Sequence, residues 1–161
     1  MNIKTELGAF FRSFRYAFSG LVYCIRSQRN FRFHLAAAFY VLILMRFYDF
    51  DRGERVLIYI VIGLVLAAEA VNTAVEAAVD LSSPKISPNA KIAKDCAAAA
   101  VLITAIAAAA AGFVMFWDTK VFSRIADYFS EHTARLVLLI LSVPVWFIII
   151  FLPNNKRQGD K

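Results

Sequence analysis

Two long apolar runs constrain this chain more than any other feature. The runs over residues 96–117 and 136–153 contain no charged residue. A helix that spans a bilayer needs about 20 mostly apolar residues, so both runs predict membrane-spanning helices. The segments 33–48 and 56–79 are also apolar, but each carries charged residues. They span a membrane only if those charges lie near a helix end or face the protein interior.

Composition supports the membrane assignment. Of the 161 residues, 60% are hydrophobic and 19% are charged, and the net charge is +6. A soluble domain has about 45–50% apolar and 25% charged residues. Basic character is also typical of nucleic-acid binding, which needs an exposed basic face on a soluble domain. This composition leaves little room for such a face, so we expect the lipid bilayer, and no nucleic acid, as a partner.

The N-terminal segment 3–26 has the period of an amphipathic helix. Its apolar residues recur at helical spacing, and most of its basic residues fall elsewhere on the wheel. A basic amphipathic helix of this kind suits the membrane surface. The first 32 residues hold six Lys or Arg residues and one Glu. The positive-inside rule therefore predicts a cytoplasmic N-terminus, which also places the 81–95 loop and the C-terminal tail in the cytoplasm.

The predicted fold class is an all-α integral membrane protein. We expect a surface helix over residues 3–26, followed by membrane-spanning helices. Their predicted ranges are 31–49, 55–80, 91–117 and 135–153. The connection 118–135 is long enough for a short interfacial helix, and the tail 154–161 is polar.

The second spanning segment has a polar face that contains candidate functional residues. At 100° per residue, its three acids and one amide fall within about an 80° arc of one helix. A lysine and an aspartate begin the third segment, and the short loop 81–89 brings them to the same membrane surface. The predicted cluster contains Glu69, Asn72, Glu76, Asp80, Lys94 and Asp95.

This cluster has the residue types that phosphoryl transfer needs. Carboxylates suit Mg²⁺, which also bridges substrate phosphates, and a lysine holds phosphate as a point charge. A carboxylate in an apolar wall suits a general base. Two alternatives remain at this point: polar groups that only join helices, and an ion-coupled transporter that uses Glu69 and Glu76.

Four stretches of the sequence resemble the prokaryotic diacylglycerol kinase/undecaprenol kinase family of small membrane lipid kinases. The resemblance covers roughly residues 10–117. Within it, the amino-acid sequence is nearer the Gram-positive undecaprenol kinase branch. The matching stretches are Ser13–Gly20, Arg29–Leu35, Glu69–Asp80 and Ala90–Asp95. The resemblance implies a kinase domain over 1–117 with three spanning helices, and an addition over 118–161 that holds the fourth.

The resemblance also implies an activity and a setting. The enzyme would be a phosphotransferase that moves the γ-phosphate of ATP, with Mg²⁺, to the terminal hydroxyl of a membrane lipid alcohol. Undecaprenol is the first expected acceptor and diacylglycerol the second. The family is trimeric, with active sites shared between protomers, so we expect a homotrimer in the bacterial inner membrane with both termini cytoplasmic.

Residue roles follow from the resemblance, position by position. Glu69 would be the general base and Asn72 would orient the lipid hydroxyl. Glu76 and Asp80 would bind both the nucleotide and its metal. The other expected nucleotide-binding residues are Lys94 and Asp95.

Three further positions complete the expected site. Arg12 and Tyr16 would lie at the lipid interface. Gln28 stands where the family commonly has a Glu that shares metal with Glu76, so we expect only a weak metal ligand there. A catalytically weak relative kept as an interaction protein is therefore a further alternative. His34 is interpreted as a polar interface residue.

Overall fold

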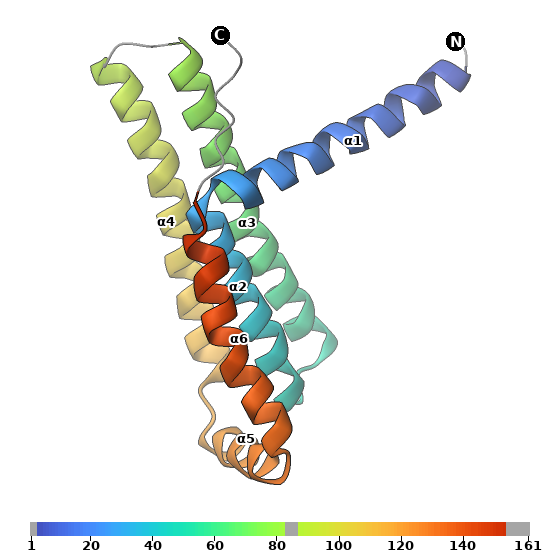
Figure 1. The fold of residues 1–161 in the computed structure, drawn as a ribbon, viewed down its shortest axis with the longest axis vertical. Helices are drawn as coiled ribbons and strands as arrows, with labels where there is room; N and C mark the ends of the chain where they lie inside the picture. Colours follow the sequence, from blue (N-terminus) through green and yellow to red (C-terminus); the bar gives the residue numbers. More distant parts are fainter. Residues whose placement is uncertain (1–2, 83–86, 154–161) are drawn as a thin grey trace.

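The computed structural model describes residues 3–82 and 87–153, which contain α-helices, one 3-10 turn and no strand. Four of the described helices, counting α2 together with η1, are long and apolar enough to span a membrane. The predicted all-α membrane fold is confirmed. The elements of Figure 1 are α1 (Ile3–Ser27), α2 (Arg29–Leu44), η1 (Met45–Phe47), α3 (Arg52–Ser82), α4 (Pro88–Phe116), α5 (Thr119–Glu131) and α6 (Thr133–Phe151).

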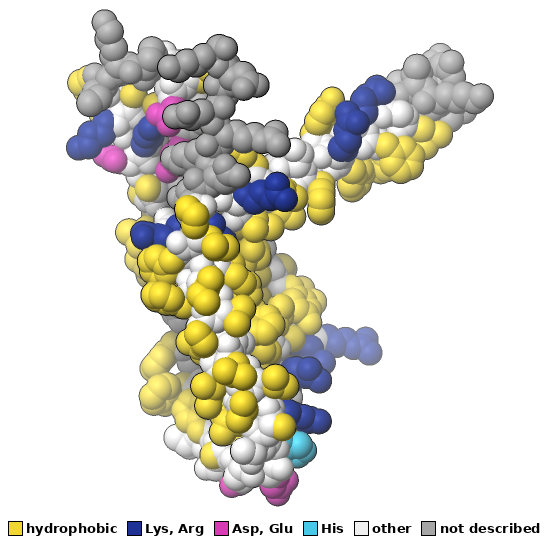
Figure 2. Space-filling view, in the orientation of Figure 1, with side chains coloured by type: hydrophobic (Ala, Val, Ile, Leu, Met, Phe, Trp, Pro, Cys, Tyr) yellow, Lys and Arg dark blue, Asp and Glu magenta, His cyan; other side chains and the backbone are white. Residues whose placement is uncertain are grey.

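Helix α1 leaves the bundle and extends away from it (Figure 1). In Figure 2 its basic side chains lie along one side and hydrophobic side chains lie along the other. Phe10, Phe14 and Phe18 are each more than half exposed in the single chain. This is the geometry of a helix that lies in the membrane surface, with its aromatic side chains directed into the acyl region.

The other long helices form a bundle. Helices α3 and α4 are consecutive in the chain and pack along each other, while α2 packs on α3 and α6 packs on α2. Alanine-rich stretches of α4 allow close approach of helix backbones. No residue of α6 is buried in the single chain, as expected for a helix whose surface faces lipid.

The lengths of the helices differ in a way that matters for the site. Helices α3 and α4 have 31 and 29 residues. At about 1.5 Å per residue they are roughly 46 and 44 Å long, whereas the hydrocarbon core of a bilayer is about 30 Å thick. Figure 1 shows that their ends next to residues 82 and 87 reach beyond the point where α1 joins the bundle, so we expect these ends to extend into water.

Some predicted boundaries differ from the observed ones. The first spanning helix begins at Arg29 and ends with η1 at Phe47, two residues before the predicted end, because Tyr48 takes an extended conformation. Helix α6 continues through Pro144 to Phe151. The tail after residue 153 and Lys85 of the loop, both assigned to the cytoplasmic side, lie outside the described residues.

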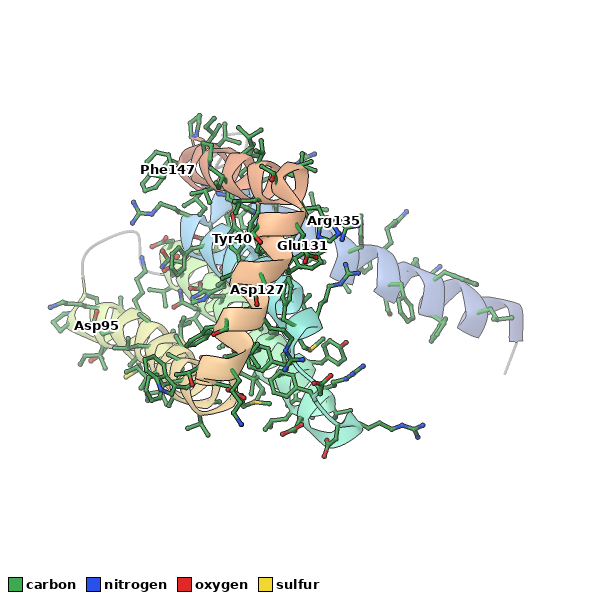
Figure 3. The ribbon with its side chains drawn as sticks, turned by 90° about the horizontal axis from the view of Figure 1, so that it is seen from below. Tyr40, Asp95, Asp127, Glu131, Arg135 and Phe147 are labelled. Atoms are coloured by element: carbon green, nitrogen blue, oxygen red, sulfur yellow. The ribbon has the colours of Figure 1, made fainter. Side chains whose placement is uncertain are left out.

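The end of the bundle opposite α1 is closed by α5, which crosses it (Figures 1 and 3). Asp118 caps α5 by accepting a 2.8 Å hydrogen bond from the Lys120 backbone amide. Next to this cap, the buried Tyr48 hydroxyl donates a 2.5 Å hydrogen bond to the carbonyl oxygen of Phe116. Burial, with a smaller contribution from Asp118, raises the pKa of Tyr48, so the phenol remains a donor at neutral pH.

We predict that Tyr48→Phe destabilises the bundle. The change removes the donor to the last carbonyl group of α4 and keeps the ring, so we expect a loss of about 1 kcal/mol in the free energy of unfolding. Unfolding in mixed detergent micelles measures it. Tyr59→Phe is the matched control because the Tyr59 ring is exposed on α3. Equal stability of the two variants would contradict the role of the Tyr48 hydroxyl.

Candidate active site

The polar face of α3 passes from a buried to an exposed environment. Glu69 is 2% exposed and Asn72 is 8% exposed. Glu76 is half-buried, and the side chain of Asp80 is 65% exposed. Measured along α3 at 1.5 Å per residue, Glu69 lies about 25 Å from Arg52 and Asp80 about 42 Å. One helix face therefore connects the edge of the hydrocarbon core with water.

Glu69 faces a partner on α2. Its Oε1 atom lies 3.5 Å from Nε2 of His34, whose side chain is 17% exposed. One turn above Glu69, the buried Thr73 hydroxyl donates a 2.8 Å hydrogen bond to the Glu69 carbonyl oxygen. A buried carboxylate without a polar partner is costly, so His34 helps to explain how Glu69 is tolerated at this depth.

Glu76 is held between two amide side chains. Nε2 of Gln28 lies 3.5 Å from one of its carboxylate oxygens, and Nδ2 of Asn72 lies 3.3 Å from the other. The Oδ1 atom of Asn72 is buried and has no hydrogen-bond partner among the described residues. The predicted proximity of Gln28 to Glu76 is thus present, and the Asn72 oxygen is available to a ligand.

Asp80 and Lys94 form an ion pair that joins α3 to α4. Both side chains are partly exposed, at 65% and 38%, so the pair adds little to stability. Its effect is to hold a lysine ammonium group at the water-facing end of the polar face. Asp95 is exposed beside it on α4 (Figure 3).

The donor set fits a magnesium ion that arrives with a nucleotide. Among the described residues, no group of three or more His, Cys, Asp and Glu side chains is placed to hold a metal by itself. Mg²⁺ needs only one or two protein carboxylates when phosphates supply its other ligands. Glu76 provides one carboxylate, and Gln28, whose side-chain amide lies beside it, carries a neutral oxygen donor.

Two predicted site residues lie away from this cluster within one chain. Arg12 and Tyr16 are on the extended part of α1, and both are exposed. Arg12 is 16 residues before Gln28, a distance of about 24 Å along a helix. The single chain therefore assembles the residues of α2, α3 and α4, but not those of α1.

The structure adds residues that pattern reasoning did not assign to the site. The sequence alone indicates a polar interface residue at His34, and only its packing reveals Glu69 as its partner. Arg32 is 4% exposed and donates a 3.0 Å hydrogen bond to the carbonyl oxygen of Leu152, just after α6. The guanidinium of Arg29 lies over the ring of Phe151. The additional helix is thus attached beside the cluster.

The chain is similar to known lipid kinases of membranes. The family described as prokaryotic diacylglycerol kinase matches residues 15–116. The undecaprenol kinase of Bacillus subtilis is 41% identical over 113 residues, which cover 70% of this chain and 92% of that protein. The diacylglycerol kinase of Synechocystis sp. is 41% identical over 101 residues, which cover 62% of this chain and 58% of that protein.

The family match spans α2, α3 and α4 and therefore includes every residue of the polar cluster. It ends where α4 ends, so α5 and α6 are additions to the matched region. The chain belongs to the prokaryotic diacylglycerol kinase family.

Proposed function

We propose that this protein transfers the γ-phosphate of ATP to the terminal hydroxyl of a membrane lipid alcohol, with undecaprenol as the first candidate. The observation that carries the proposal is the polar face of α3, which links buried Glu69 to exposed Asp80. A lipid hydroxyl and a water-borne nucleotide can meet only at such a boundary. The name of the Bacillus relative favours undecaprenol, and that of the Synechocystis relative makes diacylglycerol the second candidate.

On the lipid side, Glu69 is the proposed general base. As the hydroxyl oxygen forms its bond to the γ-phosphorus, Glu69 takes the hydroxyl proton, and the bond from that phosphorus to the leaving ADP oxygen breaks. Asn72, three residues along the same face, orients the hydroxyl through its free Oδ1 atom. His34 is a positioning residue, because it contacts Glu69 and holds the carboxylate in place.

On the water side, the proposed nucleotide ligands are Glu76, Asp80, Lys94 and Asp95. Lys94 supplies positive charge to the phosphates, and Asp80 fixes its position through their ion pair. Glu76, with Asp80 and weakly with Gln28, would hold Mg²⁺. When bound, this ion neutralises charge that develops on the phosphates during transfer.

The proposed setting is the inner membrane of a bacterium, with the N- and C-termini in the cytoplasm. The charge of the first 32 residues supports this orientation, since it places the nucleotide residues on the side that holds ATP. The proposed assembly is a homotrimer. Arg12 and Tyr16 then reach lipid or phosphate at a neighbouring protomer, because α1 extends away from its own bundle (Figure 1). Residues 1–117 form the proposed kinase domain, and 118–161 are an addition to it.

The direct test is transfer of labelled phosphate from ATP in membranes that offer undecaprenol or diacylglycerol. We predict faster transfer to undecaprenol. Glu69→Gln and Glu76→Gln should each lower the rate at least about 100-fold, since one removes a base and the other a metal ligand. Glu131→Gln, which changes an exposed acid of α5, is the matched control and should retain the wild-type rate.

Three results of this assay would change the account. Faster transfer to diacylglycerol would make diacylglycerol, instead of undecaprenol, the acceptor. Ion flux through proteoliposomes without ATP consumption would favour a transporter and contradict the kinase. If turnover becomes detectable only in Gln28→Glu, the protein would be a catalytically weak member of the family that acts as an interaction protein. Size-exclusion profiles identify any variant that fails to fold.

We predict that Gln28→Glu strengthens the response to magnesium. The change replaces an amide beside Glu76 by a second carboxylate, and two such groups repel each other unless a cation lies between them. The Mg²⁺ concentration for half-maximal transfer should fall at least about threefold. Without Mg²⁺, the melting temperature should fall below that of the wild type. Asn30→Asp adds an exposed charge two residues away and controls for net charge. An unchanged Mg²⁺ dependence would place Gln28 away from the metal.

Lys94→Met should weaken nucleotide binding while leaving the fold intact. It removes the ammonium group that Asp80 positions, so we expect the KM for ATP to rise at least about tenfold. Lys91→Met removes an exposed lysine one turn earlier on α4 and is the matched control. Initial rates over a range of ATP concentrations measure both. Equal shifts in the two variants would indicate a general charge effect instead of a specific site.

A further inference from the structure

A cavity of about 840 Å³ lies at the opposite end of the bundle from the polar cluster. Its walls come from α2 with η1 on one side and from α5 and α6 on the other. Arg46 in this wall is 18 residues after Gln28, or about 27 Å along the helix. The family match ends at residue 116, so the α5 and α6 walls lie outside it. The cavity is therefore separate from the proposed site of phosphate transfer.

One part of the wall is strongly basic. Three arginines and a single acid line the cavity. Nη1 of Arg124 lies 3.1 Å from Oδ2 of Asp49, so this acid is paired. Arg46 has no hydrogen bond or ion pair among the described residues. Arg135 lies over the Tyr128 ring and donates a hydrogen bond to its hydroxyl, at the point where α5 meets α6 (Figure 3).

The other part of the wall is apolar. Phe39 and Ile43 of α2 face the cavity together with Leu138 and Leu139 of α6. These residues belong to two helices that are long and apolar enough to span a membrane, so this wall suits contact with acyl chains. Phe47 packs against the rings of Tyr128 and Phe129, at 5.1 and 5.8 Å between centroids, and so holds the α5 wall against η1.

We propose that this cavity binds an anionic phospholipid, with its phosphate at the arginines and the start of its acyl chains along the apolar wall. Guanidinium groups bind phosphate oxygens through paired hydrogen bonds, and two positive charges here remain uncompensated. The volume lies within the range of about 300–1,000 Å³ that is typical of ligand sites. A free phosphate would leave the apolar wall uncovered, and an uncharged lipid would leave the arginines without a partner.

Native mass spectrometry of the full chain in detergent tests the proposal. The probes are phosphatidylglycerol, phosphatidylcholine and inorganic phosphate, each added alone and then in competition. We expect retention of phosphatidylglycerol, with no displacement by inorganic phosphate. Arg46→Gln/Arg135→Gln should weaken this binding at least about tenfold. Arg52→Gln/Lys120→Gln removes two exposed basic residues at the same end of the bundle and should alter it less than about twofold.

A second variant keeps the charges and fills the space beside the apolar wall. Leu139→Trp should also weaken phosphatidylglycerol binding, and its melting temperature and size-exclusion profile show whether it folds. Equal losses in the two double variants would overturn the proposal, because binding would then follow net charge. Equal retention of phosphatidylcholine, displacement by inorganic phosphate, or no retained lipid would overturn it too. The last result would indicate that a neighbouring copy or nothing fills the cavity.

Discussion

The burial of one carboxyl group, Glu69, within a membrane helix is the constraint on which the rest of the site depends. A side chain that is 2% exposed at this depth needs polar neighbours, and the structure provides His34 from α2 and a face of α3 that becomes steadily more polar toward water. Packing of α2 on α3 is therefore required for the site, because without it the carboxylate would face lipid. The same packing brings Gln28 to Glu76.

The mismatch between helix length and membrane thickness explains how the site includes a water-exposed part as well as a buried one. Helices α3 and α4 exceed the hydrocarbon core by about 15 Å, which is enough to carry the Asp80–Lys94 ion pair into water. In the proposed reaction, the lipid hydroxyl reaches Glu69 from the membrane and the nucleotide reaches Lys94 from water, along one face of α3. This arrangement suits a kinase with an apolar acceptor, and the sequence contains neither a P-loop nor a glycine-rich nucleotide-binding motif.

Much of this arrangement could be predicted from the sequence, because periodicity and charge are local properties. The fold class and the grouping of Glu69, Asn72, Glu76 and Asp80 on one face follow from spacing along a single helix. The pairing of His34 with Glu69 and the attachment of α6 through Arg32 could not be predicted, since both depend on how separate helices pack. The basic cavity could not be predicted either, because its arginines come from the segments 46–55 and 118–135, each of which holds three basic and three acidic residues.

The central claim, that a buried Glu69 positioned by His34 accepts the proton of the lipid hydroxyl, has one direct test. The kcat and KM for phosphate transfer are measured for His34→Ala, Glu69→Asp and the double variant. Residues that act as one unit give non-additive losses. The account predicts a lower kcat in each single variant, a nearly unchanged KM for ATP, and a double variant no slower than the slower single one. Losses that multiply, or a change confined to KM, would contradict it.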